Sequence, residues 1–154
     1  MHRRVSGVWA CALVFLFSFA VQAETGTVPR RTAQPGYDVS REITVNGTVS
    51  SLLAKPSPGM MWGAHLLLRT SAGNVDASLG RFALMGKGAL SVQAGQQVAV
   101  TGLMVTIRGQ AVLLARIVRA GGQAYLLRST HGTPLSPTAR RLALLKAAQN
   151  GGQL

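Results

Sequence analysis

Apolar and polar residues alternate along residues 41–53, where every second position from Ile43 to Ser51 carries an apolar or small side chain. An alternation with a period of two is typical of a β-strand that buries one face. Gly47 lies in the middle of this segment, and a glycine inside a strand usually marks a bulge or a sharp bend. The pattern therefore predicts a long first strand that bends midway.

Four further segments have a strand-like composition, and turns that contain glycine separate several of them. They are residues 64–70, 74–80, 96–107 and 111–120, and residues 121–129 add a last short strand. Residues 81–90 fit a short helix or a loop better than a strand. Three strands, a connector and two strands form the order of a five-stranded OB barrel, in which a bent first strand serves both sheets.

We therefore expect an all-β fold: a small five-stranded OB-like barrel with a short helical connector, spanning residues 41–136. A jelly roll and an immunoglobulin sandwich are the alternatives, but the first needs more strands and the second has no helical connector at this place. Residues 137–154 combine strong helix formers with arginine and lysine. They predict a basic C-terminal helix with a short tail.

The N-terminal residues carry a targeting pattern. Residues 1–23 combine Arg3 and Arg4 with an apolar run and with small residues before Ala23, which are the three parts of a secretory signal peptide. We expect cleavage after Ala23 and a periplasmic or secreted protein without a membrane span, and an uncleaved membrane anchor is the alternative. Residues 24–40 mix proline, glycine, threonine and arginine without an apolar period, and they predict a flexible leader.

The charge is strongly positive, with 16 lysines and arginines against 4 carboxylates and a formal net charge of +12. Loss of the signal peptide would remove two arginines and the only cysteine, Cys11, so the mature chain has to fold without disulfides. A basic chain attracts nucleic acid, anionic envelope polymers and anionic lipid headgroups. The competing interpretation is that the charge serves only solubility.

The chain is poor in groups that catalyse reactions. Outside the predicted signal peptide and leader it offers two histidines, His65 and His131, and two carboxylates, Glu42 and Asp76. It has no paired carboxylates at a useful spacing, no zinc-type histidine pair and no glycine-rich phosphate loop. We therefore expect a protein that is not an enzyme and holds no cofactor.

Copper is the sharpest alternative to a protein without a metal. Met60, Met61 and His65 supply thioether and imidazole ligands that suit Cu(I), and Trp62 supplies an aromatic face. The set is similar in residue type, although not in order or spacing, to that of small periplasmic copper chaperones with an OB-like barrel. The competing interpretation is that the methionines and the tryptophan cover the mouth of the barrel.

Anion binding is the other candidate activity. OB barrels bind nucleic acids and oligosaccharides on the face of strands two and three and in the flanking loops, with basic side chains for the backbone and aromatic side chains for stacking. The residues expected on or beside this surface are Lys55, Trp62, His65, Arg69, Arg81, Arg108 and Arg116. With one convincing stacking residue, Trp62, the pattern favours nonspecific binding over the reading of bases.

Several motifs resemble those of small exported bacterial OB-fold-like proteins, which are mostly uncharacterised. They are Gly-Ala-His-Leu from Gly63, Leu79-Gly80, Gly-Gln-Gln-Val-Ala-Val-Thr-Gly from Gly95, and the Leu-Arg that begins the segment ending at Leu135. The resemblance spans residues 43–135 and implies a fold more than an activity. The chain departs from the pattern by having Arg81 for proline, Gln96 and Ser129 for acids, and Ser136 for tryptophan.

The sequence thus predicts an exported OB-like module that binds an anionic polymer, either nucleic acid or an envelope polymer, or an envelope protein. A periplasmic Cu(I) chaperone that uses Met60, Met61 and His65 is the alternative. A purely structural subunit of an envelope complex is the third hypothesis.

Overall fold

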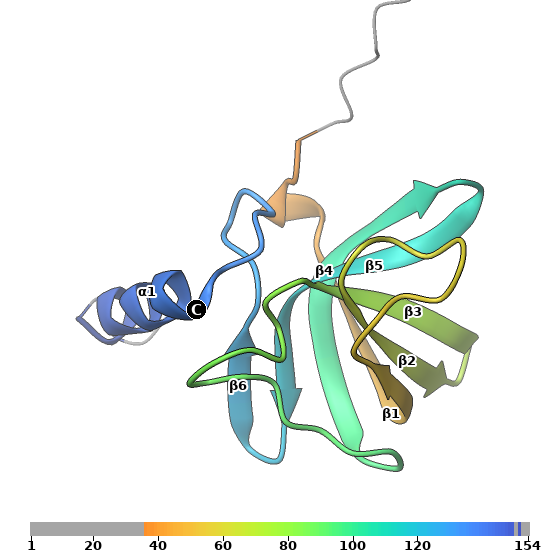
Figure 1. Ribbon diagram of the computed structural model, residues 1–154, viewed down its shortest axis with the longest axis horizontal. Coiled ribbons are helices and arrows are strands. Elements are labelled where there is room, and N and C mark those ends of the chain that lie inside the picture. Colours follow the sequence, from red (N-terminus) through yellow and green to blue (C-terminus); the bar gives the residue numbers. More distant parts are fainter. Residues whose placement is uncertain (1–35, 150, 152–154) are drawn as a thin grey trace, which may run out of the picture. The chain divides into compact units, whose positions relative to one another are not determined.

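The computed structural model describes residues 36–149 and residue 151. The predicted signal peptide and most of the predicted leader lie outside these residues. The described chain begins with a short 3₁₀ helix, continues with six strands and ends with an α-helix (Figure 1). The elements are η1 (Val39–Arg41), β1 (Ile43–Leu53), β2 (Ala64–Thr70), β3 (Gly73–Gly80), β4 (Gln97–Ile107), β5 (Gln110–Ala120), β6 (Gln123–Leu126) and α1 (Pro137–Gln149).

Strands β1 to β5 close into a barrel, which confirms the predicted fold. The strand order is β3-β2-β1-β4-β5-β6, and a parallel pairing of β3 with β5 closes the sheet on itself. All other pairings are antiparallel. The N-terminal half of β1 pairs with β4 and its C-terminal half pairs with β2, so the first strand serves both sides of the barrel, as the sequence predicts.

The bends of the barrel come from irregularities in β1 and β4. In β1 the register shifts between Val49 and Ser51, shortly after Gly47. In β4 the register shifts between Thr101 and Gly102, where the backbone of β5 comes so close that a Cβ atom on Gly102 would collide with the carbonyl oxygen of Leu114. A glycine is therefore required at the tightest point of the β4–β5 ladder.

The connector between β3 and β4 consists of turns and contains no regular helix within the described residues, so this detail of the prediction is corrected. Gly86 and Gly88 both adopt a positive φ, which ends any helical run that the surrounding leucines favour. The amide of Leu90 donates to the carbonyl of Ala83 at 2.8 Å and closes the segment into a loop. Ala83, Leu90 and Val92 are buried and join the core of the barrel.

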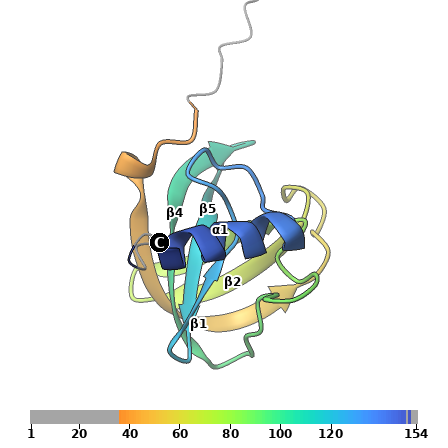
Figure 2. The same ribbon diagram turned by 90° about the vertical axis from the view of Figure 1, so that its left-hand side faces the viewer.

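The predicted C-terminal helix is present and lies against the connector. The hydroxyl of Ser136 accepts a hydrogen bond from the amide of Ala139, and Pro137 occupies the first helical position, which is a favourable start for a helix. Arg140 is the buried residue of this helix, and it donates to the carbonyls of Gly88 at 2.6 Å and Phe82 at 2.8 Å. Figure 2 shows α1 running across one side of the barrel.

None of the helices in the described part of the chain has the length and apolar character needed to cross a membrane.

Candidate ligand-binding surface

His65 lies on the outer face of the barrel wall, because its neighbour Leu66 points into the core and side chains alternate along β2. It is nevertheless fully buried, with 0% of its surface exposed. Its Nδ1 is 2.6 Å from Oδ1 of Asp76, and its Nε2 is 2.9 Å from the carbonyl oxygen of Met61. Both ring nitrogens thus face acceptors, an arrangement that only the doubly protonated ring satisfies fully.

The pKa of His65 reflects this environment. Burial by itself lowers the pKa, but the hydrogen bonds to Asp76 and to the Met61 carbonyl outweigh burial and raise the pKa above its ordinary value. When the ring is protonated, the imidazolium and the Asp76 carboxylate form an ion pair under the β1–β2 loop. His65 therefore ties the loop to the β2–β3 face.

Two further contacts, at Met60 and Gly63, fix the conformation of the β1–β2 loop. The amide of Met60 donates to the carbonyl of Ser57 at 3.1 Å. Gly63 has a φ of +121° and packs so tightly on the peptide between Gly80 and Arg81 that a Cβ atom would lie 2.7 Å from the Gly80 carbonyl carbon. The loop is therefore anchored on both sides of Trp62, through Met61 and Gly63.

Trp62 is 80% exposed although its neighbours in the chain are anchored. The contact between Gly63 and the Gly80–Arg81 peptide brings Arg81 to the same end of the barrel, and the Arg81 guanidinium lies 4.7 Å from the ring centroid of Phe82. Lys55 is an exposed residue of the same loop. We call the group of Lys55, Trp62 and Arg81 the Trp62 surface.

The other predicted residues lie elsewhere. Arg69 pairs with Asn74 beside the β2–β3 turn, and Arg108 lies in the β4–β5 turn with a φ of 51°. Because β3 and β5 are parallel, both arginines are at the end of the barrel where these strands begin, and Arg81 is at the end where β3 stops. The structure therefore places Trp62 and Arg81 at one end of the barrel and Arg69 and Arg108 at the other.

One end of the β2–β3 face, which the sequence predicts as the binding surface, is covered at His65 and Ser78. His65 and Ser78 are both 0% exposed, and they are paired across the two strands. Above them lie the β1–β2 loop and Arg128, whose Nη2 donates to the hydroxyl of Ser78 at 3.3 Å. Access for a ligand is therefore open on the outer side of the loop and not on the strands beneath it.

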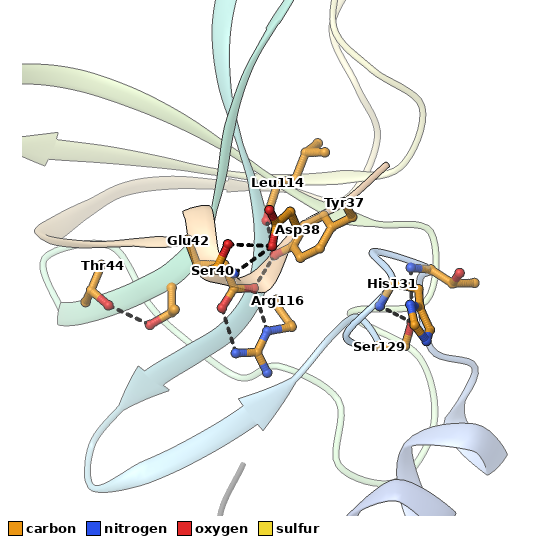
Figure 3. Close-up of polar contacts among 11 residues, drawn as sticks. Tyr37, Asp38, Ser40, Glu42, Thr44, Leu114, Arg116, Ser129 and His131 are labelled. Carbon is orange, nitrogen blue, oxygen red and sulfur yellow. Dashed lines mark hydrogen bonds and ion pairs between the residues drawn. The ribbon is translucent and has the colours of Figure 1, made fainter. Parts of the chain in front are cut away.

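Arg116 is not a free cation. Its Nε and Nη2 donate to the two carboxylate oxygens of Glu42 at 2.6 and 2.7 Å, and the hydroxyl of Tyr37 donates to the same carboxylate at 2.5 Å (Figure 3). Burial raises the pKa of Glu42, but the bonds from Arg116 and Tyr37 overcome this effect and hold it below its ordinary value. This cluster fastens the chain before β1 onto β5. Tyr37 belongs to the segment that the sequence predicts as a flexible leader.

Replacing Glu42 by glutamine should destabilise the protein by about 2 kcal/mol at pH 7, since the partly buried Arg116 then loses its charged partner. Because the folded pKa is lowered, the wild-type contribution is complete above pH 4.5 and is lost as the pH falls through the folded pKa. Urea unfolding at pH 7 and at pH 3 measures both effects. Asp38→Asn, at an exposed carboxylate, is the control and should change stability much less; an equal loss in both variants would refute the assignment.

Two buried arginines have no carboxylate partner among the described residues. Arg128 donates to carbonyl oxygens of Gly132 and Ser78, and Arg140 donates to those of Gly88 and Phe82. Burial lowers the pKa of both guanidinium groups. The sequence signals that Arg128 lacks an acidic neighbour, because Ser129 stands where the resembling proteins have an acid. The Ser129 hydroxyl instead accepts hydrogen bonds from the amides of His131 and Thr133.

The three residues proposed as copper ligands have other contacts within the protein. Both nitrogens of His65 are engaged, Met61 faces His65 through its carbonyl oxygen, and the Met60 sulfur accepts from the amide of Ser57 at 3.4 Å. The described residues contain no cluster of three or more histidine, cysteine, aspartate or glutamate side chains around a common point. Copper binding stays a prediction from the sequence.

The exposed charge is almost entirely positive. Among the described residues three carboxylates are present, and two of them, Glu42 and Asp76, are engaged in ion pairs. The exposed basic residues are Arg41, Lys55, Arg69, Arg81, Lys87, Arg108, Arg119, Arg141 and Lys146. The molecule is thus a small basic β-barrel protein with an exposed tryptophan on an anchored loop.

The chain belongs to the MamS/MamX magnetosome protein family, whose family model matches residues 41–125, more than half of the chain. The match covers the five barrel strands and ends within β6. The match supports the resemblance to a bacterial protein family. The more specific likeness to exported OB-fold-like proteins stays a prediction. Searches among curated proteins and among solved structures found no match.

Proposed function

We propose that this protein is an exported, non-enzymatic module that binds an anionic polymer at the Trp62 surface. The observation that carries the proposal is the exposure of Trp62, at 80%, on a loop anchored through Met61 and Gly63. An indole that is already exposed on an anchored stretch of backbone can stack on a base or a sugar ring without breaking other contacts, and less backbone entropy is lost when it binds.

Charge supports an anionic ligand. Arg81 lies at the same end of the barrel as Trp62, and Lys55 belongs to the same loop as Trp62. Asp38 is the one exposed carboxylate among the described residues. Phosphate or uronate groups of a polymer would be drawn to this surface, and its rings would stack on the indole. The features that support binding do not include a set of hydrogen-bond donors and acceptors that would distinguish one base from another. We therefore propose binding without sequence preference.

The family name supports a second candidate, a protein partner. The family is named for magnetosome proteins, so we propose a protein of such an assembly as the alternative occupant of the Trp62 surface. Capture of one protein partner in stoichiometric amount, with loss of that partner in Trp62→Ala and no binding of polymers, would favour this candidate over the first.

The test is a titration of labelled single-stranded DNA, and of an acidic polysaccharide, with protein purified after export. Fluorescence anisotropy at about 50 mM and about 200 mM salt should show weaker binding at the higher salt. Trp62→Ala should lose about tenfold in affinity, the loss expected for one stacked ring. Met85→Ala, at another exposed apolar residue, should bind like the wild type.

A second pair of variants tests the charge. Arg81→Ala should lower the slope of affinity against salt by about one unit, as expected for one ionic contact. Arg119→Ala removes the same charge from an exposed position on β5 and should change the slope less. Binding that does not respond to salt, or equal effects at Trp62 and Met85, would refute the proposal.

A further inference from the structure

A groove of about 700 Å³ lies between the connector and α1, apart from the Trp62 surface. Its lining includes Lys87 from the connector and Pro137, Arg140, Arg141, Leu144 and Leu145 from the helix. A groove of this volume is in the range of sites that hold small-molecule ligands.

The polar part of the lining is positive. Lys87 and Arg141 are exposed, and no carboxylate lines the groove among the described residues. Arg140 is 1% exposed, and its two terminal nitrogens donate to backbone carbonyls. Its Nε has no hydrogen-bond partner in the described chain. A guanidinium buried without a counter-ion is costly, and an anion bound in the groove would reduce this cost.

Exposed apolar side chains lie in the wall of the groove and on the neighbouring surface of α1. Leu142 is 62% exposed and Leu145 is 53% exposed, and Leu144 joins Pro137 in the wall of the groove. Exposed leucines cost free energy in water, and here Leu142, Leu144 and Leu145 lie between Arg141 and Lys146 on one short helix. The leucines and basic residues of α1 are not separated onto opposite faces of the helix, so its apolar contact with a ligand would come from Leu144 and Leu145 in the wall of the groove.

We infer that this groove and the exposed leucines of α1 form a site for an anionic phospholipid at a membrane surface. The headgroup phosphate lies between Lys87 and Arg141, close to the buried charge of Arg140, and the acyl region contacts Leu144 and Leu145. A lipid combines both chemistries in one molecule, whereas inorganic phosphate uses only the charged part. The site goes beyond the proposed polymer binding, because it shares no residue with the Trp62 surface.

The test is flotation of the exported protein with vesicles of phosphatidylcholine alone and with increasing phosphatidylglycerol. Binding should rise with the phosphatidylglycerol fraction. The double variant Lys87→Glu/Arg141→Glu should lose at least about tenfold in affinity, given that each basic residue near the surface contributes about fivefold. Arg108→Glu/Arg119→Glu makes the same change in net charge outside the groove and should lose much less.

Leu145→Ser tests the apolar part without a change in charge, and it should weaken vesicle binding about threefold or more. Met85→Ser, at an exposed apolar residue outside the groove lining, is its control. Circular dichroism checks that the variants fold, and each groove variant should bind the labelled DNA at least as well as its own control variant does. That last measurement separates failure of the lipid site from failure of the polymer site.

Three results would overturn the inference. The first is an equal loss in the groove variants and their controls. The second is release from vesicles by millimolar inorganic phosphate at constant ionic strength, which would assign the groove to a free anion. The third is release by an acidic peptide at the same concentration of negative charges, which would assign it to a protein partner.

Discussion

Gly102→Val should cost about 3 kcal/mol or more and leave most of the protein unfolded at moderate denaturant concentrations. A side chain at this position would collide with the carbonyl group of Leu114 and would lie 3.0 Å from the Cα of Ala115. Both obstacles are backbone atoms of β5, so no side-chain rotation relieves the collision. The ladder between β4 and β5 would have to open at its register shift.

Chemical unfolding followed by circular dichroism measures this loss. Ala99→Val is the matched control, because it adds a branched side chain to the same strand at a half-buried position. The control should change stability by less than about 1 kcal/mol. A Gly102→Val protein as stable as this control would show that the close approach of β5 does not constrain the barrel.

The second large effect is expected at His65. His65→Ala should lose about 3 kcal/mol, since it empties a fully buried site and leaves the Asp76 carboxylate and the Met61 carbonyl without their donors. It should also release the β1–β2 loop, and affinity for the polymer at the Trp62 surface should fall even though His65 does not contact the ligand. His131→Ala, at an exposed histidine, is the control and should leave both properties nearly unchanged.

The contribution of His65 depends on pH. Its folded pKa is raised above the ordinary value of 6.5, so the folded state holds the proton more tightly than the unfolded state does. The stabilisation is complete below pH 6.5 and is lost as the pH rises through the folded pKa. Unfolding free energies from pH 5 to pH 9 should therefore fall with pH in the wild type more steeply than in His65→Gln. Parallel curves would refute the ion pair with Asp76.

The fold could be predicted largely from local patterns. The alternation in β1 and the glycine-separated strand segments specify which residues form strands, and their order specifies a barrel. Local patterns predict the connector less well, because Ala83, Leu84 and Met85 favour a helix locally whereas Gly86 and Gly88 take positive φ values and turn the chain. The burial of Ala83 and Leu90 in the core then selects the loop.

The candidate site could be predicted only in part. Trp62, Lys55 and Arg81 are exposed, in keeping with a role as ligand contacts. His65 and Arg116 carry side chains that suit the same role, yet both are engaged with acids. Glu42 and Arg116 are 74 residues apart, and their pairing depends on how the chain before β1 meets β5. The residue pattern of one segment cannot predict which residue of a distant segment will pair with it.

By itself the sequence determines a small basic chain with barrel-forming strands and a C-terminal helix, because alternation, turn residues and helix propensity are local properties. The tertiary structure alone decides which polar side chains are buried and hydrogen-bonded within the protein. His65 is buried under its own loop, Arg140 holds α1 to the connector, and Trp62 is left in solvent. The reason is physical: burial and hydrogen-bond partners are set by contacts between distant segments, and those contacts exist only after the barrel has closed.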